Sequence, residues 1–202
     1  RGSKDLQERF IGNAFMLNEA ERERILKHPT GKYPHTALTK PFYDKAKDLD
    51  DVTKMQYIDI HFWLIGDILL KADKMSMANS LEVRVPFLDR VVFDVARKVP
   101  TEYKVNKENT KFAMRQAAHR YLPDMVAEKK KLGFPVPIRI WLREENYYNM
   151  VKEAFHSPAA EEFFKVDEIM KYLDEHKAGK ADNSRKIWTI YMFLVWHKQF
   201  FG

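Results

Sequence analysis

The apolar residues between Met55 and Leu69 recur at alternating intervals of three and four positions. This spacing is typical of a helix that turns one face to a core, because such side chains lie on one side of an α-helix. No alternation of apolar and polar residues longer than about four positions occurs in the sequence. The sequence therefore predicts an all-α fold without a nucleotide-binding parallel sheet, organised as a single helical unit over residues 1–202.

Three positions carry the signals of helix starts. Asn18, followed by Glu21, predicts a capping box, with asparagine in the place of the usual hydroxyl residue. Asp89 is expected to cap a helix that begins at Arg90, and Thr53 is expected to cap the helix that carries the apolar stripe.

Two longer helices are predicted in the second half of the chain. One should cover about 108–121, where Leu122 and Pro123 end it. The other should cover about 184–200 and is apolar nearly all round, which predicts a central or doubly covered helix.

Composition narrows the classes of function. The net charge is +6, but basic and acidic residues are interspersed, and the one dense basic run is Lys129–Lys131. This pattern does not favour nucleic-acid binding, which needs clustered basic residues with interleaved aromatics. No apolar run approaches the ~18 residues of a membrane span, so no membrane insertion is expected. The absence of cysteine excludes disulfides and a cysteine nucleophile, and it favours a cytoplasmic location.

The glycines exclude the common phosphate loops. They stand at positions 2, 12, 31, 66, 133, 179 and 202, so no two are closer than ten residues. Walker loops and dinucleotide fingerprints need glycines within about six positions of each other. The seven histidines are never three or four residues apart, which argues against a helical zinc pair. We therefore assign no cofactor-binding or metal-binding residue in this sequence.

The segment 81–85 links two predicted helices and carries opposite charges. Val83, Val85 and Pro86 favour an extended backbone, so Glu82 and Arg84 should share one side and the valines the opposite, core-facing side. Two interpretations stay open. The charges form a solvated ion pair, or they line a partly desolvated cleft.

The longest motif is the run of seventeen positions from Asp73 to Asp89, Asp-Lys-Met-Ser-Met-Ala-Asn-Ser-Leu-Glu-Val-Arg-Val-Pro-Phe-Leu-Asp. It resembles the signature of the synthetase domain of glutamine-hydrolysing asparagine synthetases. The segment Lys129-x-Lys131-x-Gly133-Phe-Pro also resembles this family, although Lys129 stands where the family usually has arginine. Because related amidotransferases that make β-lactams share parts of the signature, the product remains open.

This resemblance implies that the chain is the helical C-terminal part of an ATP-pyrophosphatase-type synthetase domain. The intact enzyme would use ATP and Mg²⁺ to adenylate the side-chain carboxylate of aspartate. Ammonia from glutamine would then displace AMP, giving asparagine, AMP and pyrophosphate. The glutaminase domain and the Ser-Gly-Gly-x-Asp-Ser pyrophosphate loop are not in this sequence, so the chain alone is expected to be inactive. Its partners would be aspartate, ATP, ammonia and the N-terminal domains, and a homodimer stays open.

The resemblance also implies the site residues. Lys131 would be the catalytic residue, stabilising negative charge as the adenylate and pyrophosphate form. Glu82, Arg84, Asp73 and Lys74 would bind the substrate. The alternative is a non-catalytic helical module that binds an acidic partner through the lysines of 129–131.

Overall fold

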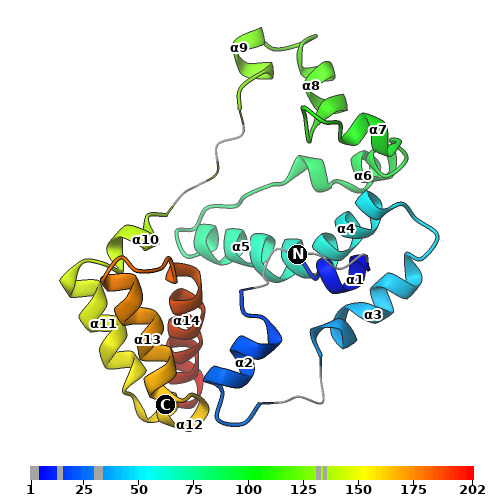
Figure 1. Cartoon of the computed structure of the whole chain (residues 1–202). Helices are drawn as coiled ribbons and strands as arrows, with labels where there is room; N and C mark the ends of the chain where they lie inside the picture. The colour runs from blue at the N-terminus through cyan, green and yellow to red at the C-terminus, as the bar shows by residue number, and fades with distance from the viewer. Residues whose placement is uncertain (1–4, 13–15, 30–33, 131–132, 134–135) are drawn as a thin grey trace. The chain divides into compact units, whose positions relative to one another are not determined.

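The computed structural model describes residues 5–12, 16–29, 34–130, 133 and 136–202 (Figure 1). In these residues every regular element is a helix, and the one β contact is an isolated bridge. The predicted all-α fold is therefore confirmed. The chain divides into two compact units, unit 1 of residues 1–13 and 36–133 and unit 2 of residues 14–35 and 134–202.

Unit 1 has a small aromatic core. Leu6, Tyr43 and Ile58 are buried there, and the Tyr43 hydroxyl donates a hydrogen bond of 2.6 Å to the carbonyl oxygen of Phe10. Its described helical elements are α1 (Leu6–Arg9), α3 (His35–Lys45), α4 (Asp51–Asp59), η1 (Ile60–Leu69), α5 (Leu70–Met77), η2 (Pro86–Leu88), α6 (Arg90–Ala96), α7 (Thr101–Lys104), α8 (Phe112–Ala118) and α9 (Asp124–Ala127).

The predicted stripe helix contains an unexpected π-helical segment. The element η1 continues α4 directly and passes into α5, so the three form one run (Figure 1). A π-helix closes i→i+5 hydrogen bonds and has more residues per turn, so an alternating spacing of three and four no longer keeps side chains on one face. Ile58 in α4 is fully buried, but Ile65 in η1 is 58% exposed. The apolar side chains of the predicted stripe are therefore no longer all buried once the chain enters the π-helical segment.

Side-chain caps fix two helix starts in unit 1. Asp89 accepts hydrogen bonds from the backbone N–H groups of Val91 and Val92, and α6 begins at Arg90 as predicted. The prediction for Thr53 is wrong. Asp50 caps α4, and the Thr53 hydroxyl donates to its carboxylate at 2.6 Å because Thr53 already lies inside the helix.

The helix predicted over 108–121 is shorter in the structure, where α8 spans Phe112–Ala118. The side-chain oxygen of Asn106 accepts hydrogen bonds from the backbone N–H groups of Glu108 and Asn109. Such local bonds compete with the helical ladder. They hold the chain in a turn where the prediction extended the helix.

Unit 2 is a helical bundle. Its described helices are α2 (Glu19–Ile25), α10 (Ile138–Trp141), α11 (Glu145–Phe155), α12 (Pro158–Phe163), α13 (Val166–Lys177) and α14 (Ser184–Phe201). Figure 1 shows α11, α13 and α14 side by side. Their inward faces form the core of the unit, which includes Phe155, Ile169, Leu173, Ile187 and Ile190.

Helix α14 covers this core with one face only. Ile187, Ile190 and Leu194 are buried, but Trp196 is 48% exposed and Trp188 is also exposed. Helix α14 is therefore central, since it contacts α10, α11, α12 and α13, but the described residues do not cover it on both sides. The buried side chains of α14 are those on the side that contacts α10 to α13, although apolar residues occur on nearly every side of the helix.

A non-local contact ties α2 to the rest of unit 2. Leu26 and Phe164 form an antiparallel bridge, in which the N–H of Lys165 donates to the carbonyl oxygen of Ile25 at 2.7 Å. The predicted capping box of Asn18 and Glu21 is confirmed at the start of α2. Glu21 also pairs with Lys186 of α14. Together these contacts place α2 against α13 and α14.

None of the helices in the described ranges combines the length and the hydropathy that crossing a membrane requires.

Candidate functional site

The candidate substrate segment begins where α5 ends. Ser80 has a φ of 54°, in the left-handed region, and the N–H of Leu81 donates to the Ser76 carbonyl oxygen at 3.0 Å. The Asn79 side chain donates to the Met75 carbonyl oxygen at 2.9 Å. These bonds satisfy carbonyl groups that a helix end leaves free. The chain therefore turns sharply into the extended segment 81–85.

Glu82 and Arg84 meet in this segment. Their side chains form an ion pair of 2.5 Å, so they share one side of the extended backbone as the sequence predicts. The Arg84 and Glu82 side chains are 85% and 69% exposed, which makes this pair solvated in the structure of this chain. Substrate binding by either residue stays a prediction.

The two valines of the segment do not face a core. Val83 is 50% exposed and Val85 is 45% exposed, so the expected core-facing side is wrong for the described chain. The alternation itself holds. No described part of the chain buries the apolar side of this segment.

Asp73 and Lys74 lie on α5, and both are exposed. Just before them Lys71 of α5 pairs with Asp67 of η1 at 3.3 Å, at the i, i+4 spacing where opposite charges meet on a helix. Both precede the end of α5 at Met77, after which the chain turns into the segment 81–85. Their contact with substrate also stays a prediction.

Lys131, the predicted catalytic residue, lies outside the described residues. The described backbone that leads to it is held by Arg115 of α8. The guanidinium donates from Nη1 to the Ala127 carbonyl oxygen at 2.7 Å and from Nη2 to the Lys129 carbonyl oxygen at 2.9 Å. Arginine is suited to this contact because its planar fork reaches two acceptors at once.

Sequence reasoning missed this role of Arg115, as well as the role of His119 four residues later. His119 donates to the Asp124 carboxylate at 2.8 Å and lies 4.0 Å from that of Glu128. Arg115 and His119 are four residues apart, so they share a face of the helix, and the acidic residue Asp124 follows soon after. This spacing is the signal that could have indicated their contacts with α9.

The described residues form no cluster of the kind that holds Mg²⁺. In the described ranges there is no group of three or more His, Asp or Glu side chains that could hold a metal ion. The sequence also has no pair of glycines close enough for a phosphate loop.

Comparisons with known proteins show the family to which the chain belongs. The family model described as asparagine synthase matches residues 2–198. The match includes the helices of both units and the segment 81–85, and the chain belongs to the asparagine synthase family.

The most informative relatives are bacterial. Asparagine synthetase [glutamine-hydrolyzing] 1 of Bacillus subtilis is 48% identical over 197 residues, covering 98% of this chain and 31% of that protein. A putative asparagine synthetase [glutamine-hydrolyzing] of Mycobacterium tuberculosis is 42% identical over 200 residues, covering 99% of this chain and 31% of that protein. Asparagine synthetase B of Escherichia coli is 32% identical over 91 residues, covering 44% of this chain and 16% of that protein.

The chain therefore spans about a third of the length of the first two relatives. No solved structure matches it significantly.

Proposed function

We propose that this chain is the helical C-terminal part of the synthetase domain of a glutamine-hydrolysing asparagine synthetase. The observation that carries the proposal is the 48% identity to the Bacillus subtilis enzyme over 98% of the chain. The family match over residues 2–198 supports it as well.

The intact protein would adenylate the side-chain carboxylate of aspartate and transfer glutamine-derived ammonia to it. ATP and Mg²⁺ would supply the activation of that carboxylate, held mainly by parts of the protein other than this chain. The products would be asparagine, AMP and pyrophosphate. A cytoplasmic location belongs to the same proposal and is supported by the lack of cysteine.

Within this function Lys131 acts as a fixed positive charge near the phosphoryl groups. Such a charge stabilises a transition state most where water is excluded, and it can be worth several kcal/mol. Arg84 would receive a carboxylate of aspartate through its planar fork and Glu82 the ammonium, with Asp73 and Lys74 nearby on α5.

The test is to express the full-length protein that contains this chain and to measure asparagine, AMP and pyrophosphate from aspartate, ATP and glutamine. We expect the three products in equal amounts. The Lys131→Ala variant should lower turnover much more than it raises the apparent constant for aspartate, because its charge acts on the transition state.

Two outcomes would contradict the proposal. A full-length protein that forms a β-lactam or another amide instead of asparagine would place the chain in a related amidotransferase. An unchanged turnover of Lys131→Ala would reduce Lys131 to a solvated loop lysine.

A further inference from the structure

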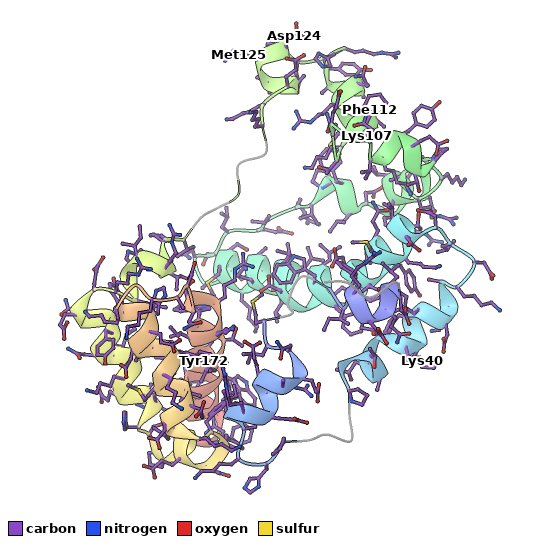
Figure 2. The ribbon with its side chains drawn as sticks, viewed as in Figure 1. Lys40, Lys107, Phe112, Asp124, Met125 and Tyr172 are labelled. Carbon is purple, nitrogen blue, oxygen red and sulfur yellow. The ribbon has the colours of Figure 1, made fainter. Side chains whose placement is uncertain are left out.

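We propose that Arg115 is a positioning residue that fixes the backbone leading into the Lys131 segment, an inference that rests on the proposed function of Lys131. Arg115 lies on α8 and contacts the C-terminal end of α9, so one side chain joins two elements that are separated by a turn. Figure 2 shows both helices, with Phe112 of α8 and Asp124 of α9 labelled.

One acceptor is the carbonyl oxygen of Ala127, the last residue of α9, and the other is that of Lys129, just beyond the C-cap. The last carbonyl groups of a helix have no intrahelical donor, and a positive charge near them also interacts favourably with the helix dipole. Arg115 supplies two donors, at 2.7 Å to Ala127 and 2.9 Å to Lys129. The second contact lies two residues before Lys131.

The helix α9 depends on such outside contacts. It has four residues, far below the length at which a helix is stable alone. Ala127 is its one buried residue, and α8 has none. Apolar packing between these two helices is therefore small, and hydrogen bonds from α8 determine where α9 lies.

His119 secures the other end of the same short helix. Its ring lies one turn after Arg115 on α8 and donates to Asp124, the first residue of α9. Because both ends of α9 are attached to α8, the chain leaves Lys129 in a defined position. Misplacement of a catalytic group by about 1 Å can lower a rate about a hundredfold.

The first part of the test uses this chain alone. Amide hydrogen exchange and trypsin cleavage after Lys129 should both become about tenfold faster in Arg115→Ala, because the carbonyl anchors are lost. Arg115→Lys should behave similarly, since an ammonium does not offer the two-donor fork. Arg120→Ala is the matched control, an exposed arginine of the next turn, and should leave both rates unchanged.

The second part uses the full-length protein. Arg115→Ala should lower kcat for asparagine formation about ten- to a hundredfold with little change in KM for aspartate. If Arg115 acts through Lys131, adding Arg115→Ala to Lys131→Ala should cause no further loss, as expected for residues that act as a unit.

The outcomes separate the two proposals. If Lys131→Ala is fully active, the proposed function of Lys131 fails. If Lys131→Ala is impaired and Arg115→Ala is not, or if the two losses multiply, the positioning role of Arg115 fails. Loss of helical signal in both Arg115→Ala and Arg115→Lys also overturns it, because Arg115 would then serve stability alone.

Discussion

Glu82 and Arg84 are exposed to solvent, yet both remain candidates for substrate binding. An exposed ion pair contributes about 0–1 kcal/mol to stability, because water screens it and both side chains lose freedom. With side chains 69% and 85% exposed, this pair cannot be explained by a large contribution to the fold. A binding role therefore competes with a weak structural one.

We expect Arg84→Ala to change the free energy of unfolding of this chain by less than about 0.5 kcal/mol. In the full-length protein the same change should raise the apparent constant for aspartate. Arg97→Ala, which breaks a similar exposed pair with Asp94, is the control and should leave aspartate binding unchanged. Equal effects of the two variants on the aspartate constant would remove Arg84 from the substrate site.

Tyr148 in unit 2 has a raised pKa. Its hydroxyl donates to the Asp174 carboxylate at 2.7 Å, and this hydrogen bond raises the pKa of Tyr148 to about 12. The neutral phenol is thus favoured in the folded state. Its contribution to stability is complete below the ordinary pKa of 10.0 and is lost as the pH rises towards about 12.

Ultraviolet titration of the phenols should therefore show a late tyrosine that disappears in Tyr148→Phe. In Asp174→Asn the pKa of Tyr148 should fall towards its ordinary value, because the charged acceptor is gone. A titration curve that is the same in the wild type and in Asp174→Asn would show that this hydrogen bond is not formed in solution.

At the scale of elements, the capping box of α2 offers a clean measurement. Asn18 accepts from the N–H of Glu21 at 2.9 Å, and Glu21 accepts from the N–H of Asn18 at 3.0 Å. Asn18→Ala should lower the free energy of unfolding by about 1 kcal/mol. Urea unfolding followed by tryptophan fluorescence is suitable, since three of the four tryptophans lie in unit 2.

The control is Asn18→Asp, which keeps an acceptor oxygen at the cap and should retain most of the stability. If Asn18→Asp lowers the free energy of unfolding as much as Asn18→Ala does, loss of the cap hydrogen bond is not the cause of the destabilisation.

Helix starts could be predicted because they depend on side chains a few residues apart. The caps at Asn18 and Asp89 follow from local chemistry alone, and the structure confirms both. The failure at Thr53 has the same origin, since more than one nearby residue could accept from that helix end and Asp50 is the one that does.

Features that depend on partners distant in sequence were not predictable. The π-helical turns of η1 keep the apolar composition of an α-helix, and the composition of α14 does not tell which face meets α13. In the candidate site the pairing of Glu82 with Arg84 followed from alternation along the backbone. The hydrogen bonds from Arg115 to the carbonyl oxygens of Ala127 and Lys129 could not be predicted in this way, because they join α8 to the end of α9.

For the whole molecule, exposed apolar side chains gather in one part of unit 1. Those at 38% exposure or more between residues 75 and 95 are Met75, Met77, Leu81, Val83, Val85, Phe87, Leu88, Val91, Val92, Phe93 and Val95. Such a run is larger than isolated surface residues would explain and is typical of surface that another part of a protein covers. It supports the proposal that this chain works within a longer protein.

The purified chain should accordingly form no asparagine from aspartate, ATP and ammonium, and it should release no glutamate from glutamine. It has no cysteine nucleophile and no closely spaced glycines. Product analysis with the full-length protein as the positive control is the measurement. Asparagine formed by the chain alone would refute the proposal that it is one part of the catalytic site.

The single helical unit expected over residues 1–202 stays a prediction. Trp63 reports on unit 1, and the other tryptophans report on unit 2. One unfolding transition seen by both would support a single cooperative unit.

The bridge between Leu26 and Phe164 has a consequence for the order of folding. The Lys165 side chain donates to the Glu23 carbonyl oxygen across 142 residues of sequence, so α2 meets its partners only late in synthesis. Closing so long a loop slows folding more than it lowers stability, because the entropy grows only with the logarithm of loop length. During translation Ile25, the buried residue of α2, therefore has no core to join until residues 36–133 of unit 1 and the later helices of unit 2 have been made.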